Sequence, residues 1–356
     1  MSTPNPLENT HDAGHPPPVS KKVFYIAGII TTVFGLDELP NVQDVACLWL
    51  LHPRLQTQAC MEPVASSAIH DWNARLKNSQ ARKGLIAVSF DQRNHGSREV
   101  NKLANESWKS GNPRHAPDMF SIYHGTALDT SLLLNYLSSY VFPKGTHNLV
   151  QNLVLGISLG GHAAWHCLLH DSRITAGIIV IGCPDYVRLM SQRAEKSKRA
   201  TWISTDRPGM AFLGSEDFPK GLLETVEKYD PAGLLLGELD TVTGDDYMHE
   251  PSDTEKTRLR PLMRDHLGGK KILCLSGGAD KLVPYKCGEP FLRWLKHAIR
   301  KDGGWFNDRD TVLVDVVDEK AGHEYSAKMK VEAIKFISGV LAGESEMKAE
   351  SRTSKI

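Results

Sequence analysis

The sequence has no apolar run near the roughly 20 residues that a membrane-spanning helix requires, so we expect no membrane span. It also lacks an excess of either charge, because 42 Lys and Arg residues balance 42 Asp and Glu residues. This balance gives no sign of a nucleic-acid partner, whose binding relies on clustered positive charge. At 356 residues, with 41% hydrophobic and 24% charged, the chain instead has the composition of a globular protein with a large core.

Cysteine is scarce and scattered, with six residues: Cys47, Cys60, Cys167, Cys183, Cys274 and Cys287. The simplest interpretation is a set of free thiols, some buried in strands, in a reducing compartment. His162, His166 and His170 repeat at four-residue spacing, which would place three imidazoles on one helix face. No Glu accompanies them as in a His-Glu-x-x-His motif, so we expect no metal site.

The strongest positive signal is the segment from Leu153 to Gly161, Leu-Val-Leu-Gly-Ile-Ser-Leu-Gly-Gly. It is typical of a buried strand that runs through Gly-x-Ser-x-Gly into a helix, the pattern of a nucleophile elbow. The strained turn needs small residues two positions before and two after the serine, and Gly156 and Gly160 supply them. Ser158 is therefore the candidate nucleophile. The alternative is a glycine-rich turn with a surface serine, and the residues that follow argue against it.

A serine hydroxyl needs a base within hydrogen-bonding reach and an acid that orients the base. Both follow Ser158 in the chain order known for this elbow. Asp280 stands just past a buried-strand pattern at 271–276, where ligands bind in open α/β sheets, and we interpret it as the orienting acid. His323 lies between a later strand pattern at 311–317 and a helical run at 326–341, and we interpret it as the base.

Both assignments have alternatives. Asp280 is equally placed to cap the helix that follows its strand. Most of the 15 histidines must be surface or packing residues, and His323 stands out only by its position. Asp315, Asp318 and Glu324 are secondary candidates for the acid, ranked below Asp280.

With these residues in order, the chain resembles the α/β-hydrolase-fold superfamily of esterases, lipases, thioesterases and some peptidases, and in particular its fungal hydrolases. Two further segments carry the resemblance. His52-Pro53-Arg54-Leu55 follows a strand pattern at 45–51, where the family usually has His-Gly and then an oxyanion-hole residue. The segment from Asp91 to Ser97 follows a strand pattern at 85–90 and is similar to the family's Asp-x-Arg-x-x-Gly-x-Ser loop.

The resemblance implies an oxyanion hole, in which backbone N–H groups stabilise the tetrahedral intermediate. One donor is expected at Leu159, the residue after the nucleophile. The second is expected in the loop after the early strand, at Arg54, with Leu55 as the fallback. Pro53 departs from the family pattern, because it has no N–H and fixes its own φ, so this loop need not follow the family's geometry.

The alternation of strand and helix patterns predicts an α/β fold: a mostly parallel, doubly wound sheet of the α/β-hydrolase type. We expect a disordered, proline-rich tail over 1–22, a core formed by 23–182 and 271–343, and a flexible C-terminal tail over 344–356. The stretch 183–270 is too long for an ordinary connection. The resemblance implies that it forms a helical lid over the active site.

Within the expected lid, a basic helical run carries Arg188, Arg193, Lys196, Lys198 and Arg199. One interpretation is that the run receives an anionic substrate such as a CoA thioester. The other, which is the commoner case for such runs, is the solvated face of a helix.

The last three residues, Ser354, Lys355 and Ile356, resemble the Ser-Lys-Leu address that a peroxisomal import receptor reads. They predict a peroxisomal protein that binds such a receptor. The alternative is a cytoplasmic protein with an unrelated polar end.

Taken together, the sequence predicts a serine hydrolase that cleaves a small-molecule carboxylic ester or thioester through an acyl-enzyme, with no cofactor. His323 would take the proton of Ser158 and return it to the leaving group, while Asp280 holds the imidazolium. By analogy, the tail and the resemblance suggest a place in fungal secondary metabolism. A peptidase, a C–C bond hydrolase and a non-catalytic ligand-binding protein are the alternatives that the same fold allows.

Overall fold

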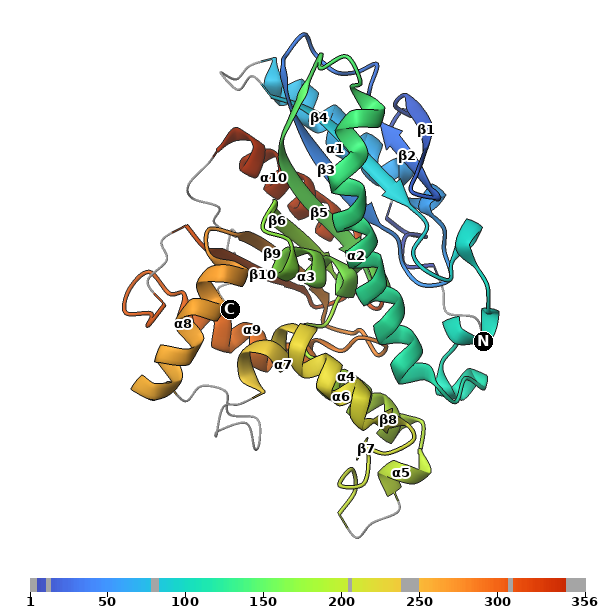
Figure 1. The fold of residues 1–356 in the computed structure, drawn as a ribbon, viewed down its shortest axis with the longest axis vertical. Helices are drawn as coiled ribbons and strands as arrows, with labels where there is room; N and C mark the ends of the chain where they lie inside the picture. Colours follow the sequence, from blue (N-terminus) through green and yellow to red (C-terminus); the bar gives the residue numbers. More distant parts are fainter. Residues whose placement is uncertain are drawn as a thin grey trace.

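The computed structural model describes residues 5–10, 14–77, 83–203, 207–237, 250–306 and 310–343. These residues form an eight-stranded sheet with helices on both faces (Figure 1), which confirms the predicted α/β class. The strand order is β1-β2-β4-β3-β5-β6-β9-β10. The strands are β1 (Lys21–Ile26), β2 (Ile29–Phe34), β3 (Asp44–Leu51), β4 (Lys83–Phe90), β5 (Asn148–Ile157), β6 (Ile174–Val180), β9 (Lys271–Gly277) and β10 (Val312–Asp318).

The sheet is mostly parallel, as expected. Only β1 with β2, and β2 with β4, pair antiparallel, and every other neighbouring pair is parallel. Parallel strands covered on both faces form near-continuous apolar runs, and Val45 to Leu51 of β3 are all fully buried. Because these strands run the same way, the loops after β3, β5, β9 and β10 meet at one edge of the sheet.

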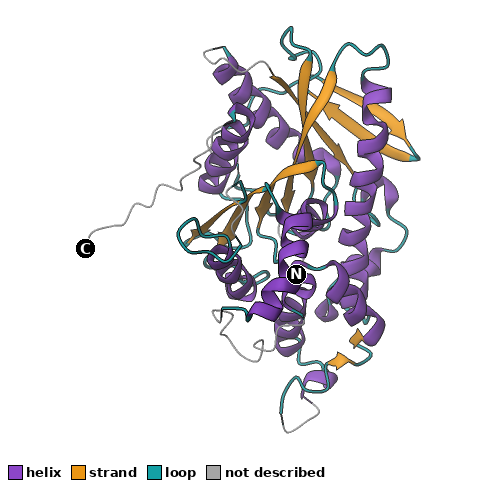
Figure 2. Ribbon diagram, turned by 60° about the vertical axis from the view of Figure 1, so that its left-hand side comes forward, coloured by secondary structure: helices purple, strands orange, loops and turns teal. Residues whose placement is uncertain are grey.

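Two helical layers cover the sheet (Figure 2). Successive residues of β3 alternate between them, because side chains of a strand point to opposite faces. Trp49 packs in the core formed with α2 (His115–Val141) and α3 (Leu159–His170), whereas Leu48 packs in the core formed with α1 (Glu62–Leu76) and α10 (Ala327–Ala342).

The stretch between β6 and β9 is a helical insertion with one small strand pair. Helices α4, α6 and α7 lie beyond the lower edge of the sheet in Figure 1. That this insertion acts as a lid over the active site stays a prediction. Its elements are α4 (Tyr186–Lys196), α5 (Ala200–Ile203), β7 (Leu213–Gly214), β8 (Phe218–Pro219), α6 (Lys220–Tyr229), α7 (Pro231–Leu236) and α8 (Asp253–Leu267), and α9 (Tyr285–Ala298) follows β9.

Short 3₁₀ helices lie in the loops that follow β3 and β4: η1 (Gln58–Met61), η2 (Gly96–Arg98), η3 (Lys102–Asn105) and η4 (Trp108–Ser110). No helix in the described ranges is long and apolar enough to cross a membrane. All six cysteines fall within those ranges and are free, and five of them are buried.

The expectation of a disordered tail over residues 1–22 is wrong for its described part. Leu7 and Val19 are buried in the core that contains α1 and α10, and β1 already begins at Lys21. Polar, proline-rich composition indicates that a segment cannot build a core of its own. It does not reveal that a few apolar side chains can dock onto a core built by the rest of the chain.

Candidate active site

Ser158 lies at the tight turn between β5 and α3. Its backbone has φ +56° and ψ −112°, which is rare for a residue with a Cβ. A Cβ on Gly156 would overlap the carbonyl oxygen of Gly160, and a Cβ on Gly160 would overlap that of Leu51. The two glycines therefore permit the close approach of strand and helix that the elbow needs.

The three residues singled out in the sequence lie in one chain of hydrogen bonds. The Ser158 hydroxyl lies 2.8 Å from Nε2 of His323, and Nδ1 of the same ring lies 2.8 Å from Oδ2 of Asp280. Ser158 and Asp280 are buried, and His323 is partly exposed. With Nδ1–H donating to the carboxylate, Nε2 is free to accept from the serine, which is the arrangement of nucleophile, base and orienting acid.

Asp280 is held by its own loop. Its Oδ1 accepts the backbone N–H groups of Leu282 at 2.8 Å and Val283 at 2.9 Å, which leaves Oδ2 for His323. Burial raises the pKa of this carboxyl, but His323 and the two N–H donors outweigh burial, so the pKa lies below its ordinary value. Asp280 does not cap α9, whose N-cap residue is Pro284.

The secondary acid candidates have other partners. Asp315 forms an ion pair with Lys296 at 2.7 Å. Asp318 accepts the hydroxyl of Ser326 at 2.7 Å, and Glu324 accepts a backbone N–H of its own loop at 3.1 Å. The geometry therefore favours Asp280 as the acid.

The two residues expected to supply oxyanion donors lie in matching positions. Leu159 is the first residue of α3, where backbone N–H groups have no partner within the helix. Arg54 lies in the loop after β3, which turns back at Leu55 with φ +63°. Because Pro53 has no N–H, the first amide that this turn offers after His52 belongs to Arg54. The donor roles of Leu159 and Arg54 remain a proposal.

His52 has a positioning role that sequence reasoning missed. Its Nδ1 donates to the Pro53 carbonyl at 2.8 Å, and its Nε2 accepts the N–H of Gln92 at 2.9 Å. Burial lowers the pKa of His52 to about 4, so the ring stays neutral and keeps this tautomer. It thereby ties the loop after β3 to the loop after β4, where Asp91 accepts the N–H and hydroxyl of Ser97. The signal was present in the sequence, because His52 belongs to the segment that carried the family resemblance.

The basic run of the insertion divides into two kinds of residue. Arg188 and Arg199 form ion pairs with the buried aspartates Asp185 and Asp217 of the insertion. Arg193 instead turns toward the site. Its Nη1 lies 3.1 Å from Nε2 of His115, and its Nη2 donates to the Leu282 carbonyl at 3.2 Å. The description of a solvated face therefore does not hold for Arg193.

The three histidines at four-residue spacing all lie in α3. Nδ1 of His162 accepts the N–H of Cys183 at 2.9 Å, and His166 lies 3.0 Å from His124. Within the described part of the chain, no group of three or more His, Cys, Asp or Glu side chains is arranged to hold a metal ion.

The N-terminal segment supports the turn that carries His323. The Pro6 carbonyl accepts the N–H of Tyr325 at 2.8 Å, and the Thr10 hydroxyl donates to the Tyr325 carbonyl at 2.8 Å. Tyr325 stands two positions after His323, and its side chain is buried in the same core as Leu7. The segment therefore fixes the backbone next to the candidate base.

We expect deletion of residues 1–13 to lower the free energy of unfolding by about 2.5–6 kcal/mol. Two hydrogen bonds contribute about 0.5–1.5 kcal/mol each, and burial of Leu7 contributes about 1.5–3 kcal/mol. Because the turn at Tyr325 loosens, kcat should fall several-fold with little change in KM. Denaturant unfolding and steady-state kinetics measure both effects. An unchanged unfolding midpoint would show that the segment does not dock. The variant Thr10→Val removes only one hydrogen bond, so its free energy of unfolding should fall by about 1 kcal/mol.

No protein-family model matches the sequence, and the search of curated proteins finds no match. Solved structures do match. Protein TT1662 from Thermus thermophilus superposes with a TM-score of 0.54 at 18% identity, over 91% of this chain and 98% of that chain. The acylaminoacyl peptidase of Pyrococcus horikoshii matches with a TM-score of 0.51 at 12% identity, over 94% of this chain. A puromycin hydrolase matches with a TM-score of 0.51 at 13% identity, over 92%.

The chain spans 43% of the peptidase and 40% of the puromycin hydrolase, so it corresponds to one part of each. Identities this low show a shared fold and carry no information about substrate.

Proposed function

We propose that this chain, which has the α/β-hydrolase fold, is a serine hydrolase that cleaves a carboxylic ester or thioester through an acyl-enzyme. The observation that supports the proposal is the chain of two 2.8 Å contacts from Ser158 through His323 to Asp280. A serine with an accepting imidazole and a buried carboxylate behind it is activated for attack on a carbonyl.

In the proposed reaction, Ser158 attacks the substrate carbonyl as His323 removes its proton. Asp280 stabilises the imidazolium, and the amides of Leu159 and Arg54 bind the oxyanion. His323 then protonates the leaving group, and the acyl group remains on Ser158. Water, deprotonated by the same imidazole, releases the acid. Every step uses groups of the chain and water.

Amide cleavage is the second candidate. The same triad serves that reaction on the same fold. C–C bond hydrolysis and ligand binding without turnover have no observation of their own in their favour.

Labelling with a fluorophosphonate probe tests the proposal, followed by mass spectrometry of the modified peptide. We expect stoichiometric labelling of Ser158. A panel of p-nitrophenyl esters, short acyl thioesters and peptide anilides is then compared by kcat/KM. We expect the highest kcat/KM for an ester or a thioester. A folded protein that neither reacts with the probe nor turns over any of the three classes would refute the assignment.

For location, we propose peroxisomal import through Ser354, Lys355 and Ile356, which lie outside the described residues, and a role in fungal secondary metabolism. A fluorescent fusion with the native C-terminus should accumulate in peroxisomes, and one that lacks the last three residues should stay in the cytosol. Cytosolic signal from both fusions would exclude import by this route.

A further inference from the structure

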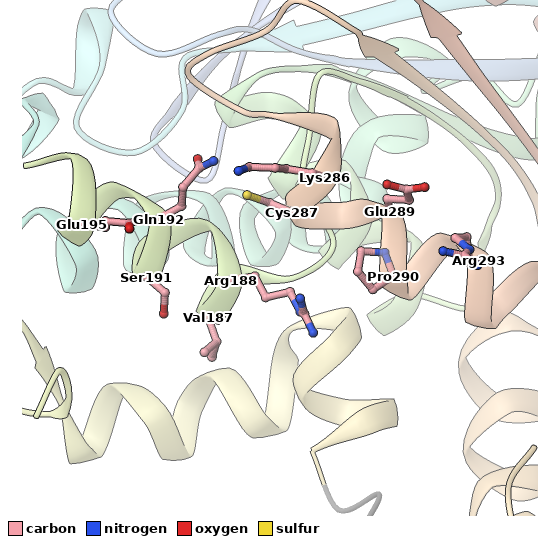
Figure 3. Close-up of a pocket in the computed structure, with 10 residues that line it drawn as sticks. All are labelled: Val187, Arg188, Ser191, Gln192, Glu195, Lys286, Cys287, Glu289, Pro290 and Arg293. Atoms are coloured by element: carbon pink, nitrogen blue, oxygen red, sulfur yellow. The ribbon is translucent and has the colours of Figure 1, made fainter. Parts of the chain in front are cut away.

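Two of the cavities that adjoin α4 differ in charge. The larger, about 580 Å³, lies between α4 and α9 (Figure 3). Its cations Arg188, Lys286 and Arg293 are accompanied by the carboxylates Glu195 and Glu289. This mixture does not select for either sign of charge.

The smaller cavity, about 150 Å³, is strongly basic. It lies between the loop after β3, the start of α2, the end of α4 and the loop after β9. Five cationic side chains and a histidine line it, and no residue in its lining carries a carboxylate. These six are Arg54, Lys109, His115, Arg193, Lys196 and Lys281.

The basic cavity adjoins the candidate active site. Leu282 lines it and donates its N–H to Asp280, while its carbonyl accepts from Arg193. The cavity is also lined by Arg54, whose backbone N–H is the proposed second oxyanion donor. Leu282 and Arg54 therefore place this cavity next to the loop of Asp280 and next to the loop that is proposed to bind the oxyanion.

Arg193 forms no ion pair with a carboxylate among the described residues. Besides His115 and the Leu282 carbonyl, its guanidinium contacts the sulfur of Met119 at 3.0 Å, and none of these groups is charged negatively. Its Nε is fully buried and has no hydrogen-bond partner among the described residues. A buried guanidinium donor without a partner is costly, and an anion in the cavity would remove that cost.

The positive charges of Arg193 and Arg54 act on the groups around them. Burial, together with Arg193, lowers the pKa of Arg54 to about 10, although Glu106 partly opposes this. Burial and the two arginines hold the pKa of His115 well below its ordinary value, so His115 stays neutral. Its Nδ1 donates to the Glu106 carbonyl at 2.9 Å, which leaves Nε2 to accept from Arg193. Asp280 attracts Arg193 electrostatically, but its Oδ2 is already engaged by His323.

We propose that the basic cavity binds a carboxylate or phosphate oxyanion carried by the substrate, with Arg193 as its principal partner. The hydrolase therefore prefers esters or thioesters that carry a negative charge close to the cleaved bond. This inference rests on the proposed function, because it places the charge relative to an acyl group on Ser158.

Matched substrate pairs test the inference on the wild-type protein. A carboxylate on the acyl group is tested by p-nitrophenyl hemiglutarate against p-nitrophenyl valerate. A phosphate on the leaving group is tested by acetyl-CoA against the neutral thioester of N-acetylcysteamine. We expect at least ten-fold higher kcat/KM for the anionic member of one pair, and the pair that shows it identifies the source of the charge. Equal or lower kcat/KM for the anionic member of both pairs would overturn the inference, while turnover of the neutral esters would leave the proposed function standing.

A variant assigns the preference to Arg193. Arg193→Met should lower the ratio of anionic to neutral kcat/KM by at least ten-fold, whereas Arg264→Met, at an exposed arginine of α8, should leave it unchanged. A ratio unchanged in Arg193→Met would mean that Arg193 serves only to hold Leu282. If Arg193→Met does not fold, competitive inhibition by glutarate or inorganic phosphate tests the proposal instead. Either anion should inhibit hydrolysis of neutral esters by the wild type, and should inhibit the Lys109→Met variant more weakly. Inhibition of both proteins with the same Ki, or of neither, would contradict the proposal.

Discussion

Ser158→Ala is expected to lower kcat by about 10⁴–10⁶-fold on the best ester of the panel, because attack by the serine oxygen is the first covalent step. The substitution removes only the hydroxyl oxygen and keeps Cβ, so the fold and the KM for the substrate should change little. The kcat is measured from release of p-nitrophenolate, and the fraction of active enzyme from the burst in a single turnover. Labelling by the fluorophosphonate should disappear from the same variant.

Ser66→Ala is the matched control. Ser66 is also a buried serine, it lies in α1, and its hydroxyl has no hydrogen-bond partner among the described residues. We expect its kcat to equal that of the wild type. If Ser158→Ala retained more than about a tenth of the wild-type kcat, another residue would have to be the nucleophile.

Asp280→Asn is expected to lower kcat by about 10⁴-fold, with the shape of the site preserved. The amide oxygen of asparagine can still accept the N–H groups of Leu282 and Val283, which bind Oδ1 in the wild type. The amide NH₂ then faces Nδ1 of His323 and forces Nδ1 to be the acceptor. The ring proton moves to Nε2, which can no longer accept from Ser158.

The matched control for this variant is Asp318→Asn, at a carboxylate that binds the Ser326 hydroxyl. We expect its kcat to stay within a few-fold of the wild type. A fall of 10³-fold or more in Asp318→Asn, together with a mild effect of Asp280→Asn, would reverse the assignment of the acid.

The carboxylate of Asp280 also makes the stability of the fold depend on pH. The pKa of Asp280 is lower in the folded protein than in the unfolded chain, so the ionised form stabilises the fold above the unfolded pKa. That contribution is lost as the pH falls through the folded pKa. Asp280→Asn should therefore unfold more easily than the wild type at neutral pH, with a difference that shrinks in acid.

Most of the fold and the three triad residues could be predicted because their signals are local. The apolar run that becomes β3, the glycines around Ser158 and the glycine before His323 each impose a conformation through residues only a few positions apart. The order of the elbow, acid and base then assigned Ser158, Asp280 and His323, although Ser158 and His323 lie 165 positions apart.

Other features could not be read from the sequence, because they depend on distant partners. The sequence alone determined a mostly parallel α/β sheet, a nucleophile elbow and the residues that would act with it, since strand burial and turn sterics are encoded within short segments. Only the tertiary structure decided that Thr10 docks on Tyr325, 315 positions away. It also decided that Arg193 turns toward the site and forms no ion pair among the described residues, whereas Arg188 and Arg199 of the same run pair with aspartates. Ion pairing and docking depend on which surfaces the completed fold brings together, and a local pattern carries no record of that.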